Sequence, residues 1–383
     1  MFGYASVHMK IKSEITDFTL CRAFFAGWVF LYHVDLYLRL SSWLGPAAHF
    51  IRRGYLGVDG FFILSGLILA GVHPELTAKP RFEHTGLRVR PLGPATVLRF
   101  WFKRLARIYP LQLATLGLLA ALLGLGLAYG LVPRDAARFS VPALAKNLLL
   151  VQGWTSAQPG AWNYASWTIS CEWAGYLLFP LLWWAMSYFD LYVALQIVIV
   201  CLVLLGFIGS KNHLSLNLSY SGGLLRFFPE FLLGIALARL VPSCADAAPR
   251  RGAAIFGGIL TALGVVIGAD PLSVIGLGCI LFAFAMQADA ERPAMLGRLP
   301  PVLFLGRLSY AFYMSFPIAE LLVSQGFRAR GWLPAGHGWT FGLGMLSITL
   351  ALALVLHFCV EIPCRRAADR WLARPVPLAA KPI

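Results

Sequence analysis

Arg22 and His33 stand in one apolar stretch near the start of the 383-residue chain, where a lipid-spanning helix normally carries no such groups. A helix would place these two side chains within about 20° of one another and roughly 16 Å apart along its axis. A charged or titratable group in hydrocarbon costs several kcal/mol unless it faces a packed interior or a wet cavity. We therefore expect Arg22 and His33 on one helix face that belongs to a functional site.

Two carboxylates also stand inside later apolar stretches. Asp59 is expected about five residues inside the outer end of the second stretch, at the same depth as His33, so the two side chains can meet. Glu172 is expected about ten residues into a later stretch, close to the middle of the membrane, and a stripe of polar side chains precedes it. Because a carboxylate at that depth needs a partner, both residues are candidates for the same site.

Arg104 and Arg107 lie three residues apart in an aromatic and basic segment, so they share one face of a helix. One interpretation is a flank of positive charge with aromatic anchors at the inner membrane surface, which composition alone favours. The other is a clamp for an anionic ligand, since a guanidinium binds phosphate through two parallel hydrogen bonds. Both interpretations place the pair at the inner boundary.

The composition of the chain is that of an integral membrane protein. Its residues are 59% hydrophobic and only 13% charged, and the mean hydropathy is +0.72. Soluble domains are roughly 45–50% apolar and about 25% charged. Apolar stretches long enough to span a bilayer predict an all-α, polytopic fold of about ten transmembrane helices, near residues 18–38, 54–73, 105–130, 162–187, 190–209, 222–241, 254–269, 272–288, 302–323 and 339–360.

The formal charge of +15 follows the membrane topology and does not form a nucleic-acid patch, because the basic residues are scattered between the hydrophobic stretches. Their excess on one side predicts that both termini are cytoplasmic. No signal-peptide pattern precedes Asp17, so we expect the first helix to remain as a signal-anchor. We predict a single domain over residues 1–383, with a cytoplasmic N-terminal segment at 1–16 and a basic cytoplasmic tail at 361–383.

Neither the seven cysteines nor the eight histidines show metal-ligand spacing or a regular disulfide pattern, so we expect no metal site. Arg226 and Glu230 are four residues apart in the sixth predicted helix, which predicts a structural ion pair. Glycines at positions 54, 57, 60 and 66 recur at the spacing of small residues that let membrane helices approach closely. We expect these features to support the fold.

Taken together, the chain resembles the membrane-bound acyltransferase 3 family over nearly its whole length. The resemblance rests on Arg22 with His33, the run Gly57–Gly66, Arg104 and Arg107 leading to Ile108–Pro110, Trp167 with Glu172 and Tyr176, Ser309 with Tyr310, and Glu361 with Pro363. Family members transfer acyl groups, usually acetyl, from acyl-CoA to extracytoplasmic glycans and other acceptors. One departure is that the ninth predicted helix has no histidine between Tyr313 and Pro317.

The resemblance implies roles for the candidate residues. Arg22 and His33 correspond to the essential pair of the family, and Arg104 and Arg107 to its CoA-contacting arginines. An imidazole with an ordinary pKa near 6.5 can take the proton of an acceptor hydroxyl, with Asp59 or Glu172 orienting the ring. Because the chain has no GxSxG motif, we expect direct transfer in preference to a serine acyl-enzyme.

The predicted function is therefore a membrane O-acyltransferase of the bacterial inner membrane that has no permanently bound cofactor. Its predicted partners are acyl-CoA, a glycan or lipid-linked acceptor and the surrounding lipids. The CoA arm would thread through a long cavity between the first three helices towards His33. A carrier or flippase for a lipid-linked glycan is the alternative, although no internal repeat of the transporter kind is evident. A non-catalytic scaffold ranks below both.

Overall fold

The computed structural model describes residues 16–42, 44–78, 81–83, 86–88, 91–130, 136–154, 162–241, 247–289 and 299–373. The N-terminal segment up to residue 15, Cys244 and the last ten residues of the basic tail lie outside these ranges. The architecture of the described residues is helical apart from one short hairpin.

The helices that build the bundle are α1 (Thr16–Leu38), α3 (Leu56–Val72), α4 (Pro94–Ala128), α6 (Trp167–Tyr188), α7 (Leu191–Lys211), α8 (Gly223–Leu240), α9 (Ala247–Ile267), α10 (Asp270–Asp289), α11 (Pro300–Ala329) and α12 (Gly338–Leu356). Shorter helices are α2 (Ala47–Arg52), α5 (Val141–Leu148) and α13 (Ile362–Leu372). The hairpin pairs β1 (Arg81–Glu83) with β2 (Gly86–Arg88) in antiparallel register, with Phe82 opposite Leu87.

Each of the ten predicted apolar stretches is occupied by one of the bundle helices. Within the described residues, six helical segments are long and apolar enough to cross a membrane, namely Pro94–Ala128, Leu191–Lys211, Arg250–Ile267, Asp270–Ala288, Pro300–Ala329 and Gly338–Leu372. The chain is thus a multi-pass membrane protein. The helices that carry Arg22, Asp59 and Glu172 are not among the six, because α1 and α6 contain more polar residues and α3 is shorter.

Three boundaries differ from the sequence predictions. Helix α4 begins at Pro94, eleven residues before the predicted 105, because Pro fits the first turn of a helix and the basic segment continues the helical pattern. Helix α6 begins at Trp167, after a 3-10 turn at Tyr164–Ser166. The last bundle helix does not end at residue 360, since α12 passes through a π-helical turn, His357–Glu361, directly into α13.

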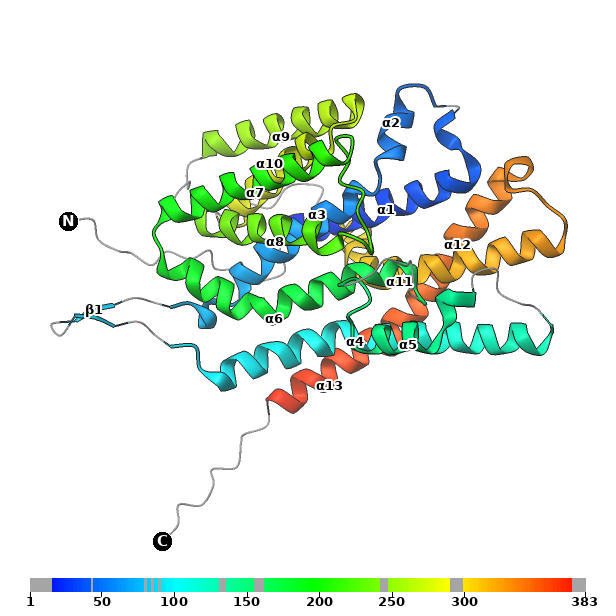
Figure 1. Cartoon of the computed structure of the whole chain (residues 1–383), viewed down its shortest axis with the longest axis horizontal. Coiled ribbons are helices and arrows are strands. Elements are labelled where there is room, and N and C mark those ends of the chain that lie inside the picture. Colours follow the sequence, from blue (N-terminus) through cyan, green and yellow to red (C-terminus); the bar gives the residue numbers. More distant parts are fainter. Residues whose placement is uncertain are drawn as a thin grey trace, which may run out of the picture.

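Most bundle helices run roughly along the long axis of the molecule, and the hairpin projects from one end (Figure 1). Helix α3 packs against α1 and α8, α11 packs against α1 and α12, and α9 pairs with α10. Helices α4 and α6 lie side by side below α8 in this view. The central helix α3 therefore has neighbours on several faces.

Glycines allow the close approach of α3 to its neighbours, as the sequence predicted. A Cβ atom at Gly57 would lie 2.6 Å from the carbonyl oxygen of Phe25 on α1. A Cβ atom at Gly66 would lie 2.1 Å from the carbonyl oxygen of Phe231 on α8, and one at Gly234 would lie 2.0 Å from that of Ile63. Because backbone cannot yield as a flexible side chain can, these positions must remain glycine.

We expect Gly66→Ala to lower the thermal stability of the detergent-purified protein, since an added methyl group at a closed helix contact costs about 1–3 kcal/mol. The measurement is the temperature at which the monodisperse peak is lost in fluorescence-detected size exclusion. Gly117→Ala is the matched control, because a Cβ atom there has no heavy atom within 4 Å. Equal melting temperatures for the two variants would contradict the packing described here.

Candidate active site

A basic vestibule of about 490 Å³ lies between α4 and the ends of α1, α3, α11 and α13. Six cationic side chains line it, against two carboxylates at Glu361 and Asp369; the cations are Arg22, Lys103, Arg104, Arg107, Arg307 and Arg365. Such an excess of positive charge in a concave, partly apolar site raises the local concentration of anions.

An inner cavity of about 210 Å³ continues from the basic vestibule into the bundle. Both spaces are lined by Ile68 and by the same three arginines, Arg22, Arg104 and Arg107. The walls of the inner cavity come mainly from α3, α4, α6 and α11, and they combine apolar side chains such as Phe62 with the carboxylate of Glu172. The structure thus brings four of the six predicted site residues together around one passage.

Helix α4 presents its arginines to this passage. Arg104 and Arg107 lie three residues apart on one face, and Pro110 stands one turn further along. Because proline has no N–H, the carbonyl of Ala106 loses its helical donor, and Ala106 also lines the vestibule. The buried Nε of Arg104 has no hydrogen-bond partner within the described part of the chain. Buried donors of this kind mark a place where a ligand oxygen can bind.

Glu172 is held at the wall of the inner cavity by Tyr176, whose hydroxyl donates to Glu172 Oε2 at 3.0 Å. Pro180 lies four residues after Tyr176 and removes the helical donor of the Tyr176 carbonyl. The indole Nε1 of Trp101 donates to that carbonyl at 3.1 Å, which joins α4 to α6. The Glu172 carboxylate therefore faces the passage from a braced part of α6.

His33 lies on the same helix as Arg22 but beyond the inner cavity. Its Nδ1 is 3.4 Å from the hydroxyl oxygen of Tyr164, and its ring lies 4.7 Å from the ring of Phe316 between centroids. Tyr164 donates in turn to Glu320 Oε2 on α11, and Tyr37 donates to Glu320 Oε1 at 2.5 Å. A carboxylate is thus linked to the imidazole through a phenol.

A layer of aromatic rings separates the inner cavity from His33. Phe61 and Tyr313 line the cavity, and their ring centroids are 6.4 Å apart. Tyr313 contacts Phe316 at 5.5 Å, and Phe316 contacts His33. In this structure the inner cavity therefore ends at these rings, and His33 lies beyond them.

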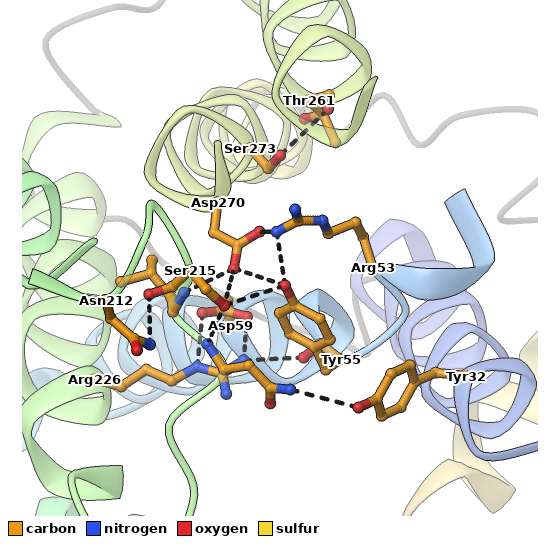
Figure 2. Close-up of polar contacts among 12 residues, drawn as sticks. Tyr32, Arg53, Tyr55, Asp59, Asn212, Ser215, Arg226, Thr261, Asp270 and Ser273 are labelled. Atoms are coloured by element: carbon orange, nitrogen blue, oxygen red, sulfur yellow. Dashed lines mark hydrogen bonds and ion pairs between the residues drawn. The ribbon is translucent and has the colours of Figure 1, made fainter. Parts of the chain in front are cut away.

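Asp59 does not contact His33, contrary to one of the two sequence predictions for that carboxylate. The Nε of Arg226 donates to Asp59 Oδ1 at 2.8 Å, and its Nη2 donates to Asp59 Oδ2 (Figure 2). The same Nη2 also donates to the carbonyl oxygen of Tyr55 at 2.9 Å. Glu230, the predicted partner of Arg226, is 4.0 Å from its Nε, so the main ion pair joins α3 to α8 instead of neighbouring turns of one helix.

A second ion pair lies beside the first (Figure 2). Arg53 donates to Asp270 Oδ1 at 2.5 Å, and Tyr55 and Ser215 donate to Asp270 Oδ2 at 2.8 and 3.0 Å. Side chains and backbone from α3, α8, α10 and the intervening loops thus form one network. Asp59 belongs to this network and not to the passage.

Two residues beside His33, Tyr164 and Glu320, were absent from the sequence predictions. Glu320 carried a usable signal, because it is a carboxylate inside the ninth predicted span, and such groups are candidates for function. Tyr164 carried none, because its proximity to His33 depends on how the turn before α6 lies against α1. Tyr310, which donates to the Ile108 carbonyl at 2.8 Å, joins α11 to α4 at the cavity wall.

Comparison with known proteins gives matches over nearly the whole chain. The model of the family described as "Acyltransferase domain" matches residues 15–358. The chain is also similar to Acyltransferase MdmB of Streptomyces mycarofaciens, with 29% identity over 371 residues that cover 87% of this chain and 86% of the relative. No solved structure matches the chain.

We expect Asp59→Ala to destabilise the protein by about 3–5 kcal/mol, because it leaves Arg226 buried without its main partner. The measurement is thermal unfolding of the purified protein. The double variant Asp59→Leu with Arg226→Met should recover much of that loss, since it removes both charges. An Asp59→Ala protein that is as stable as wild type but inactive would instead place Asp59 in the chemistry.

Proposed function

The chain belongs to the acyltransferase 3 family, and from that premise we propose that it transfers an acyl group, in the first instance acetyl, from acyl-CoA to a hydroxyl group. The proposed acceptor is an extracytoplasmic or lipid-linked glycan or a similar molecule. The observation that carries the proposal is the basic vestibule, which narrows into a cavity directed towards the only histidine on the Arg22 helix.

The dimensions and charge of the passage fit the two parts of acyl-CoA. The vestibule of about 490 Å³, with its excess of cations, suits the nucleotide and its phosphates. The narrower cavity of about 210 Å³, with apolar walls and a few polar groups, suits the pantetheine arm. Arg104 has a buried donor available for a phosphate oxygen, and Glu172 offers an acceptor for an amide N–H of the arm.

Arg22 lies where the two spaces meet, and His33 lies about 16 Å further along α1. A thioester at the end of the arm reaches the imidazole once Phe61 and Tyr313 turn aside. His33 then takes the proton of the acceptor hydroxyl while the oxygen of that hydroxyl attacks the thioester carbonyl carbon. The C–O bond forms, the C–S bond breaks, and the proton passes to the sulfur of CoA.

This proposal assigns the vestibule to the cytoplasm, where acyl-CoA is made, and His33 to the outer half of a bacterial inner membrane. Both assignments agree with the predicted cytoplasmic termini, since the start of α1 and the helix α13 lie at the vestibule. The bilayer separates donor from acceptor, and the passage brings them together.

The direct test is to incubate membranes containing the protein with acetyl-CoA labelled in the acetyl group. We expect the label to appear in the lipid or polysaccharide fraction, and mass spectrometry of those fractions from cells with and without the gene should show a matching acetyl mass difference. A carrier would be favoured if both fractions stay unlabelled and the distribution of a lipid-linked glycan between the two membrane leaflets differs between cells with and without the gene.

We expect His33→Ala to lower kcat about 100-fold or more, because a positioned general base typically contributes 10²- to 10⁴-fold. CoA affinity should remain unchanged, since the imidazole lies beyond the aromatic layer. Acetyl transfer and CoA titration measure the two effects separately. His49→Ala on α2 is the control, and comparable rates for the two variants would reject the assignment.

We expect Arg104→Ala to weaken CoA binding about tenfold or more, which corresponds to about 1.4 kcal/mol. Arg104→Lys should restore only part of the affinity, because an ammonium lacks the planar fork of a guanidinium. The measurement is calorimetric titration of the purified protein with CoA. Arg99→Ala is the matched control, since Arg99 lies on the same helix but lines a separate pocket beside His73.

A further inference from the structure

The residues behind His33 form a chain from imidazole to phenol to carboxylate. Tyr164 Oη lies 3.4 Å from His33 Nδ1 and donates to Glu320 Oε2. Tyr37 donates to the other oxygen of Glu320 at 2.5 Å. His33, Tyr164 and Glu320 come from different elements, namely α1, the turn before α6, and α11.

The position of Tyr164 is fixed by contacts that do not involve His33. Its carbonyl oxygen accepts a hydrogen bond from the Tyr220 hydroxyl at 2.7 Å. The preceding residue, Asn163, donates to the carbonyl of Met314 on α11 at 2.9 Å, and the guanidinium of Arg138 lies 5.4 Å from the centre of the Tyr164 ring. The phenol is therefore held against His33 by the scaffold.

With Glu320 taken as ionised, the number of donors points to the nitrogen of His33 that carries the proton. Two phenol hydroxyls donate to one carboxylate, and an ionised carboxylate only accepts. Because a phenol has a single O–H, and Tyr164 uses it on Glu320, the Tyr164 oxygen can only accept from His33. In this pattern Nδ1 carries the proton, and Nε2 keeps the lone pair that a general base needs.

We propose that Tyr164 and Glu320 are positioning residues that hold His33 as the Nδ1–H tautomer with Nε2 free for the acceptor hydroxyl. The inference rests on the proposed acyl transfer and adds the groups that prepare the base. When Nε2 takes the acceptor proton, His33 becomes an imidazolium, and its positive charge is stabilised by Glu320 through Tyr164. The Nε2 proton then leaves with the sulfur of CoA, which restores the starting tautomer.

The same task is performed in other enzymes by a carboxylate that contacts the imidazole directly, and loss of the correct tautomer there costs several orders of magnitude in rate. Here the carboxylate acts across one phenol. The two carboxylates expected from the sequence are engaged elsewhere, Asp59 by Arg226 and Glu172 by Tyr176. Glu320 is the carboxylate linked to His33 within the part of the chain that the structure describes.

The first arm of the test reads the tautomer without any catalysis. The full-length protein is labelled with ¹⁵N-histidine in detergent, and the His33 signals are identified by their loss in His33→Gln. We expect the Nδ1–H pattern in wild type and a mixture of tautomers in Tyr164→Phe. An Nε2–H pattern in wild type overturns the inference, whether or not acyl transfer is observed.

The second arm is kinetic and uses acetyl-CoA as the donor. Tyr164→Phe and Glu320→Gln should each lower kcat about tenfold or more while leaving the KM for acetyl-CoA unchanged, because neither side chain lines the vestibule or the inner cavity. Tyr32→Phe is the matched control. Its ring also contacts His33, but its hydroxyl accepts from Asn217 and points to the network of Figure 2.

Equal kcat values for Tyr164→Phe, Glu320→Gln and Tyr32→Phe would overturn the inference. If Tyr164→Phe does not fold, Glu320→Gln carries both arms, since it preserves the shape of the side chain. A wild-type protein that transfers no acetyl group removes the proposed function, and the tautomer is still read by the first arm. The two failures are therefore distinguishable.

Discussion

The pairing of Asp59 with Arg226 is the interaction on which the arrangement of the helices depends. Both side chains are buried, and a charge in that position is tolerated only beside an opposite charge with its hydrogen bonds satisfied. The pair fixes the rotation of α3 against α8, and the glycines at 66 and 234 set their separation. The rotation of α3 in turn decides which of its side chains form the wall of the inner cavity. An interaction remote from the acyl donor thus shapes the passage that the donor is proposed to use.

Helix α1 carries the two ends of the proposed reaction. Arg22 faces the space where the vestibule narrows, and His33 faces the turn before α6 and helix α11. The aromatic layer between them keeps the polar base apart from the water that would fill an open passage. In the proposed reaction water would compete with the acceptor hydroxyl for the thioester, so a closed aromatic layer would favour transfer over hydrolysis. The separation of Arg22 and His33 is therefore suited to the chemistry as well as to the membrane.

Much of the fold followed from apolar periodicity, but the pairing of the charges did not. Long apolar stretches predicted the bundle helices, and the spacing of Arg104 with Arg107 predicted that both face the passage. Arg22 and His33 stand on one helix as predicted, but Arg22 lines the passage and His33 does not. Asp59 illustrates the limit. Its depth along α3 was predicted to equal that of His33, but Gly57 and Gly60 on either side of it pack against Phe25 of α1, about two turns from His33. At that level α8 presents Arg226 on the side that Asp59 faces. Local spacing likewise favoured Arg226 with Glu230, because a pair across two helices leaves no regular spacing in the sequence.

Charged groups in this chain differ in whether the protein itself supplies an oppositely charged partner, and this difference separates structural charges from those of the proposed site. Arg226 and Arg53 each bind a buried carboxylate at ion-pair distance, and His357 binds Glu361 at 2.7 Å within the π-helical turn. These groups are compensated inside the protein, so their loss acts first on stability. At the passage, by contrast, cations outnumber carboxylates, and a buried nitrogen of Arg104 has no partner among the described residues. A buried donor of this kind favours the binding of an anion, because the anion supplies the hydrogen bond that the described residues do not. In the proposed mechanism the same criterion applies to His33, whose Nδ1 contacts Tyr164 and whose Nε2 is left to the substrate.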